Sequence, residues 1–186
     1  MRSPVTPRTV ILIRHAAPVA SGDVAPSEWP LSDAGCRAAE ALIGRIPLGA
    51  VLASSAERKA VRTLSIAAGV DAAELIIDSR FGEVLRPGEP FDDAVADRRR
   101  AWIEGRPDER HLGWESRSEA AARFAAGLEA IDGDQVVVAS HGMIITSWLM
   151  AIGVVPAASA GDYWAALRFP ELIEVPPIDG PLPNRW

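Results

Sequence analysis

The chain has 186 residues, of which 48% are hydrophobic and 24% are charged, so its composition is that of one ordinary globular domain and not of a disordered chain. The net charge of −6 argues against nucleic acid or an anionic membrane as a partner, and any anion must bind in a local basic pocket. The single cysteine, Cys36, excludes an internal disulfide framework and a multi-cysteine metal site, and we expect it on a helix.

The apolar stretches are too short for an export signal or a membrane span. The stretch after Thr9 is interrupted by Arg14 and His15, and the apolar segment 142–155 contains Thr146 and Ser147. We therefore expect a cytoplasmic protein with no membrane partner, and a free thiol is consistent with that compartment.

Short apolar runs alternate with helix-like stretches along the chain, which predicts an α/β architecture. The expected strands cover about 9–13, 50–53, 75–77, 136–139, 165–169 and 172–175, and the expected helices cover about 33–45, 56–68, 92–104, 116–131 and a segment from 142. Ser32 or Asp33 is expected to cap the first helix, and the hydroxyl groups of Ser54 and Ser55 the second. The charged run 97–100 is typical of a solvated helix face. The chain 1–186 is expected to be a single domain with a proline-rich tail from about 176 to 186.

Two of these strands end in histidine. Val10 to Ile13 is a run typical of a strand buried on both faces, and Arg14 and His15 follow it directly. The strand 136–139 leads to Ser140 and His141. If these strands are parallel neighbours, both histidines lie at one carboxyl edge of the sheet, where ligands bind in α/β folds.

This edge has the chemistry of an anion site. Arg14 offers a charged fork suited to phosphate, and a helix that starts at Gly142 adds backbone N–H donors and the positive end of its dipole. The alternative from the residues alone is a polar cap on a strand. A zinc site needs a third protein ligand, and His111 lies in a polar loop without a matching spacing, so we expect neither a metal nor another cofactor.

Four segments in the same order resemble the histidine phosphatase superfamily, the phosphoglycerate-mutase-like fold. They are the Arg-His pair with the strand before it (10–16), a Pro-Leu-Ser-x-x-Gly element (30–35), the Ser-Ser helix start with Lys59, Ala60 and Thr63 (54–64), and the Ser-His-Gly element (136–143). The resemblance implies a three-layer sandwich in which a mostly parallel central sheet has helices on both faces.

The resemblance also implies roles for the residues at the strand ends. His15 is the expected nucleophile, which forms a phosphohistidine that water hydrolyses. Arg14 and His141 are expected to bind the phosphoryl oxygens, with His141 in its cationic form. A neutral imidazole nitrogen attacks without prior deprotonation, which agrees with this choice of nucleophile.

The chain departs from the family pattern at the phosphate-binding residues. Ala16 stands in place of a glycine, and Lys59 stands in place of a second phosphate-binding arginine, although lysine lacks the bidentate fork. Arg58 and Arg62 flank Lys59 and are alternative phosphate contacts, and Arg62 lies one helical step from Lys59 on roughly the same face. Ser21 is a further candidate contact in the first loop.

The proton donor has two possible alignments. Reading residues 78–83 as Asp-x-Arg-Leu-x-Glu places the acid at Glu83, whereas reading them as Glu-x-x-Phe-Gly places it at Asp78. We favour Glu83, because that alignment keeps a glutamate and an upstream arginine.

These features predict a metal-independent phosphomonoester hydrolase that acts on a small phosphorylated substrate through a phosphohistidine on His15. One alternative is a phosphoglycerate-type mutase, which is disfavoured because no set of carboxylate-binding basic residues is recognisable outside the core motifs. The other is a catalytically weakened phospho-ligand-binding protein, suggested by Ala16 and Lys59. The sequence indicates neither the substrate nor the oligomeric state.

Overall fold

The computed structural model describes residues 8–110 and 113–177, and His111 and most of the proline-rich tail lie outside these ranges. Within them, one mixed sheet has the strand order β3-β2-β4-β1-β5. Its strands are β1 (Thr9–Arg14), β2 (Val51–Ser54), β3 (Ile76–Ile77), β4 (Gln135–Ser140) and β5 (Glu171–Val175). The first four are parallel to their neighbours and β5 is antiparallel to β1, so the expected mostly parallel sheet is confirmed.

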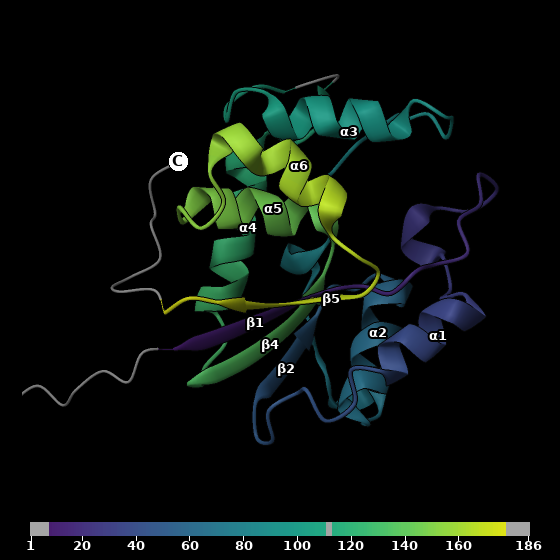
Figure 1. Ribbon diagram of the computed structural model, residues 1–186, viewed down its shortest axis with the longest axis vertical. Coiled ribbons are helices and arrows are strands. Elements are labelled where there is room, and N and C mark those ends of the chain that lie inside the picture. The colour runs from purple at the N-terminus through teal and green to yellow at the C-terminus, as the bar shows by residue number, and fades with distance from the viewer. Residues whose placement is uncertain (1–7, 111–112, 178–186) are drawn as a thin grey trace, which may run out of the picture.

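Helices cover both faces of this sheet (Figure 1). The helices α1 (Asp33–Glu40) and α2 (Arg58–Ala68) lie on one face, and α3 (Val95–Glu104), α4 (Arg117–Glu129), α5 (Gly142–Ala151) and α6 (Ala160–Ala166) lie on the side of the other. Short 3-10 turns cover Pro26–Glu28 (η1), Ala72–Glu74 (η2), Ser79–Phe81 (η3) and Ala157–Ser159 (η5). This is the three-layer sandwich expected from the resemblance.

The central strands β1 and β4 divide the core into two clusters by side-chain alternation. Leu12 and Val138 pack with α4 and α5, whereas Ile13 and Val137 pack with Leu64 and other residues of α2. All four strand residues are 0% exposed, because helices cover the sheet on both sides. The continuous apolar runs in the sequence reflect this double burial.

Several element boundaries differ from the expected ones. The Oγ atom of Ser32 accepts a hydrogen bond from the Gly35 N–H at 3.0 Å and caps α1 as expected, but α1 ends at Glu40 and not near Arg45. The second helix starts later than expected, with Glu57 as its N-cap residue and without a side-chain cap. The hydroxyl of Ser55 is instead directed to the site described below.

The C-terminal third contains one wrong assignment. The segment 165–169, expected as a strand, contributes Ala165 and Ala166 to α6, since alanine favours a helix and the chain turns only after Leu167. The second expected strand, 172–175, is confirmed as β5. Cys36 lies on α1 as expected and has no disulfide partner in the described chain. No helix of the described residues is long and apolar enough to cross a membrane.

Candidate active site

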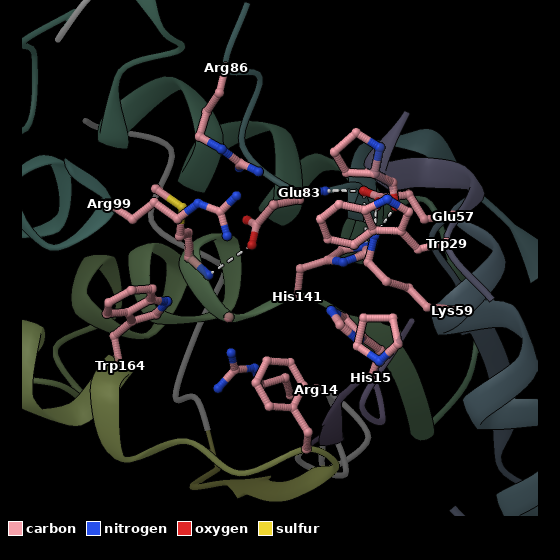
Figure 2. Close-up of a pocket in the computed structure, with 15 residues that line it drawn as sticks. Arg14, His15, Trp29, Glu57, Lys59, Glu83, Arg86, Arg99, His141 and Trp164 are labelled. Carbon is pink, nitrogen blue, oxygen red and sulfur yellow. Dashed lines mark hydrogen bonds and ion pairs between the residues drawn. The ribbon is translucent and has the colours of Figure 1, made fainter. Parts of the chain in front are cut away.

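The two histidines meet at the carboxyl edge of the sheet. β1 and β4 pair in parallel with Arg14 opposite Ser140, and the His15 N–H donates to the Ser140 carbonyl at 3.0 Å. The rings of His15 and His141 therefore lie with their centroids 5.1 Å apart. They line a small cavity of about 100 Å³, shown in Figure 2, together with Arg14, Trp29, Glu57, Lys59, Glu83, Arg86, Arg99, Trp164 and Phe169.

The backbone after β1 selects the tautomer of His15. Its Nδ1 atom lies 2.8 Å from the carbonyl oxygen of Ala16, which can only accept, so Nδ1 carries the proton. The Nε2 atom therefore holds the lone pair. Burial, and then the proximity of His141, lower the pKa of His15 well below its ordinary value, so the ring is neutral at pH 7.

Ala16, which replaces the family's glycine, is fully buried and held in place by α2. Its N–H donates to the Thr63 hydroxyl at 2.9 Å, and that hydroxyl donates to the Lys59 carbonyl at 2.7 Å. The helix start and the loop after β1 are thus fixed to each other.

Arg14 is buried at the lower edge of the cavity in Figure 2. Its guanidinium carbon lies 3.5 Å from the centroid of the Phe169 ring, and Nη1 donates to the carbonyl of Leu167. Burial lowers the pKa of Arg14 to about 10, opposed by the charge of Glu83, so the group remains cationic at pH 7. Its buried Nε has no hydrogen-bond partner among the described residues.

His141 contacts two groups from the start of α2. Its Nε2 atom lies 2.8 Å from the Ser55 hydroxyl and 3.2 Å from Oε1 of Glu57. Burial lowers the pKa of His141 to about 4 although Glu57 acts in the opposite direction. At pH 7 the protein groups alone therefore favour the neutral ring, and a bound anion would favour the cationic form expected from the sequence.

Lys59 lies in the cavity but is already paired. Its side chain is 6% exposed, forms an ion pair with Glu57 and donates to the Pro26 carbonyl at 2.7 Å. Burial disfavours the ionised form of Glu57, yet its neighbours His141 and Lys59 hold its pKa below the ordinary value. Glu57 was not among the expected site residues, and its place two residues before Lys59 is the local signal for it in the sequence.

Glu83 binds the N-terminus of α5. Its carboxylate accepts the backbone N–H groups of Val84, Met143 and Ile144 at 2.9, 3.2 and 3.0 Å. Burial raises its pKa, but Arg86, the other nearby cations and these donors outweigh that effect and lower the pKa to about 2. The helix N-terminus that the sequence suggested as a site for a bound anion is therefore occupied by a carboxylate of the chain itself.

Comparison with known proteins assigns the family. The model of the histidine phosphatase superfamily (branch 1) matches residues 10–164. The chain belongs to the histidine phosphatase superfamily. Among curated proteins, none matches it.

Several solved structures share this fold. A mycobacterial glucosyl-3-phosphoglycerate phosphatase is 25% identical over 83% of this chain and 84% of that chain, with a TM-score of 0.61. That phosphatase has also been solved with inorganic phosphate and with VO3. A protein from Thermus thermophilus is 22% identical over 78% of this chain and 85% of that chain, with a TM-score of 0.61, and shares the fold.

Three candidate residues of this superfamily member do not line the cavity. Asp78 forms a bidentate ion pair with Arg80 and caps η3. Ser21 donates to the Asp23 carboxylate at 3.1 Å on an exposed loop. Arg62 lines a separate groove together with Cys36 of α1 and Arg58 of α2, and neither histidine lines that groove.

Two arginines in the cavity were not expected there. Arg86 comes from the loop after η3, and Arg99 comes from the charged run 97–100, which was interpreted as a solvated helix face. That interpretation is correct for Arg100, whose side chain is 40% exposed and pairs with Glu104 and Asp162, and wrong for Arg99. The side chain of Arg98 is only 18% exposed and pairs with Asp92 outside the cavity. Two basic residues from outside the core motifs therefore line the cavity.

Proposed function

We propose that this chain hydrolyses small phosphomonoesters through a phosphohistidine formed on His15. The observation that carries the proposal is the tautomer of His15, whose Nε2 lone pair lies in a cavity that also contains Arg14 and His141. Membership of the histidine phosphatase superfamily supports it, as do the phosphatase structures that bind phosphate.

In the first half-reaction, Nε2 of His15 attacks the phosphorus atom while the bond from phosphorus to the leaving oxygen breaks. Arg14 and His141 bind the phosphoryl oxygens, and the phosphate charge favours the protonated form of His141. Because phosphoryl transfer depends chiefly on position and electrostatics, a buried site with a high density of cations suits this step.

Glu83 is the proposed proton donor to the leaving oxygen. In the protein alone its pKa is about 2, but a phosphoryl dianion next to it repels the carboxylate charge and raises that pKa. Substrate binding is therefore coupled to protonation of Glu83. In the second half-reaction, water attacks the phosphorus of the phosphohistidine, and Glu83 accepts a proton from that water. The bond from phosphorus to Nε2 breaks, inorganic phosphate is released, and His15 is regenerated in its neutral form.

The cations of the chain supply the charge that phosphoryl transfer needs, since Arg14, Lys59, Arg86 and Arg99 all line the cavity. We therefore expect hydrolysis to continue in the presence of a chelator such as EDTA.

A phosphoglycerate-type mutase is the second candidate, and the position of Arg86 and Arg99 favours it more than the sequence did. Such an enzyme returns the phosphoryl group to a hydroxyl of the substrate. Isomerisation of 3-phosphoglycerate in the presence of 2,3-bisphosphoglycerate, at a rate above that of phosphate release, distinguishes it from a hydrolase.

The direct test is the hydrolysis of p-nitrophenyl phosphate at mildly acid pH by the natural chain and by His15→Ala. We expect turnover and an acid-labile phosphoenzyme for the natural chain, and a loss of turnover by about three orders of magnitude or more in the variant. Phosphate binding without turnover in the natural chain contradicts the proposal and indicates the phospho-ligand-binding protein instead.

A further inference from the structure

Arg117, at the start of α4, is a buried arginine without an acidic partner. It is 8% exposed, and it forms no ion pair within residues 8–110 and 113–177. Its Nη1 atom donates to the backbone carbonyl of Ile103, which is the one hydrogen bond of its guanidinium group in that part of the chain. Burial lowers the pKa of Arg117, and no carboxylate of the described residues offsets this effect. Because a buried charge without a partner is costly, this arginine indicates a site for an anion.

Arg14 in the candidate active site has the same features. It is 9% exposed, its Nη1 atom donates to one backbone carbonyl, and it forms no ion pair with a described residue. In contrast, Arg86 and Arg99 are both paired with the carboxylate of Glu89. The features that Arg14 shares with Arg117 thus accompany a cavity that we assign to an anion. Arg117 does not line that cavity, so its unpaired charge needs a separate explanation.

Arg117 lines a groove of about 360 Å³ between α4 and α5, a volume within the range of small-molecule sites. The hydroxyl groups of Ser118 and Ser147 also border the groove, but each already donates to a backbone carbonyl. Arg117 is therefore the one charged group of the described residues in this groove. The rest of the wall is apolar and consists of Pro107, Ala121, Met150, Ala151 and Ala157.

The groove is separate from the phosphate cavity, because no described residue lines both. The helix α5 connects the two sites. Met143 in its first turn lines the cavity, whereas Met150 in its last turn lines the groove. The rise of an α-helix places the Cα atoms of these methionines about 10 Å apart. Figure 1 shows α4 and α5 beside each other, on the side of the sheet opposite to α1 and α2.

We propose that this groove binds a small carboxylate with an apolar body, whose carboxylate pairs with Arg117 and whose body packs against Ala121, Met150 and Ala151. The edge of the guanidinium formed by Nε and Nη2 is the one that binds a carboxylate through two parallel hydrogen bonds, and Nη1 alone is used by the protein. One guanidinium balances one negative charge, which a phosphate dianion exceeds. A sugar would lose hydrogen bonds to water against the apolar wall. The inference is independent of the reaction proposed for His15.

Methionine methyl resonances report on each site separately, because the chain has three methionines and two of them line the different sites. The natural chain, labelled with carbon-13 at these methyl groups, is titrated with 4-phenylbutyrate and with its neutral amide, 4-phenylbutyramide. We expect 4-phenylbutyrate to shift the Met150 resonance with a dissociation constant on the order of 1 mM, and the amide to bind about tenfold more weakly. The Met143 resonance should not shift. The variant Met150→Leu assigns the Met150 resonance.

Variants of the groove test each contact. Arg117→Met removes the cation, so the affinity for 4-phenylbutyrate should fall about tenfold, to that of the amide. Ala151→Leu fills part of the apolar wall and leaves Arg117 in place, so both compounds should bind more weakly, and it decides the matter if Arg117→Met does not fold. In the matched control Arg110→Met, both affinities should stay constant, because Arg110 is 61% exposed, pairs with Glu119 and does not line the groove.

Three outcomes would overturn the proposed carboxylate site. An unchanged Met150 resonance at saturating 4-phenylbutyrate shows that the groove does not bind this class of ligand. Equal dissociation constants for the acid and the amide show that Arg117 does not pair with the carboxylate. Displacement of 4-phenylbutyrate by inorganic phosphate places the carboxylate in the phosphate cavity instead. The hydrolysis of phosphomonoesters is measured separately and is unaffected by these results.

Discussion

His15 and His141 lie with ring centroids 5.1 Å apart at the ends of two adjacent parallel strands, and each affects the charge state of the site. A proton on His141 would oppose one on His15, which helps keep His15 neutral. Since Nδ1 of His15 is bound to the Ala16 carbonyl, the neutral ring presents Nε2. We expect this arrangement to combine the proposed nucleophile with a neighbour whose cationic form is favoured by a bound anion.

The variant Glu83→Gln tests whether Glu83 or Asp78 is the proton donor. The amide cannot donate a proton to a leaving oxygen, so we expect kcat for an alkyl phosphate such as glycerol 3-phosphate to fall by about 10²–10⁴. The loss should be much smaller for p-nitrophenyl phosphate, whose leaving group needs no proton. The control is Asp78→Asn, which alters an ion pair with Arg80 outside the cavity and should change kcat less than about twofold. A larger loss in Asp78→Asn than in Glu83→Gln contradicts the assignment.

Lys59→Met tests which basic residue of α2 takes the place of the family's second arginine. Lys59 lines the cavity, whereas Arg62 lies in a separate groove, so only the first variant removes a charge near bound phosphate. We expect the inhibition constant of inorganic phosphate to rise roughly tenfold in Lys59→Met, consistent with the loss of a charge-assisted contact of about 1.5 kcal/mol. In Arg62→Met it should stay constant. A weaker affinity in Arg62→Met alone would support the alternative contact.

The stability of the chain should fall as the pH decreases below about 6.5. Burial lowers the pKa of His141 from 6.5 to about 4 and shifts that of His15 in the same direction. Between these values the unfolded state binds more protons than the folded state, so the free energy of unfolding decreases as the pH falls through this range. Thermal unfolding between pH 4 and 8 measures the slope, which should be smaller in His141→Asn.

Inorganic phosphate should oppose this effect, because a bound anion favours the imidazolium of His141. We expect the increase in Tm at a fixed phosphate concentration to be larger at pH 6 than at pH 8. In His141→Asn the increase should be small at both values. An equal increase at pH 6 and pH 8 in the natural chain contradicts the coupling of phosphate binding to protonation.

The sequence indicates the residues of the site that stand at strand ends. Arg14, His15 and His141 directly follow runs that are buried on both faces, and the parallel arrangement of such strands brings their ends together. Arg86 lies in a loop, and Arg99 lies on the charged helix α3. In such segments the local sequence pattern does not predict which way a side chain points. The position of these two arginines depends on how α3 and the loop before α3 pack against the rest of the fold. Contacts such as those between α3 and α6 join residues far apart in the sequence, so a local pattern cannot predict them. Glu57 was missed for a related reason, since its partners His141 and Glu83 are distant in sequence.

Two glycines in close contact with aromatic side chains should respond differently to substitution by alanine. A Cβ atom at Gly127 would lie 2.7 Å from Cε1 of Phe81, a fully buried ring between α4 and the sheet. A Cβ atom at Gly142 would lie 3.1 Å from Nε1 of Trp164 and 3.2 Å from Nε of Arg14. The first contact is part of the core, and the second is part of the candidate site.

We therefore expect Gly127→Ala to lower stability by about 1–3 kcal/mol, because the overpacked Phe81 ring and helix α4 must move apart. Gly142→Ala should act mainly on binding, since a displacement of Arg14 by a few tenths of an ångström misaligns its contact with the phosphoryl group. The measurement is Tm together with the inhibition constant of inorganic phosphate for both variants. Gly142→Ala should raise that constant several-fold with a smaller change in Tm than Gly127→Ala, and the reverse order would show that Arg14 is not sensitive to its packing against α5.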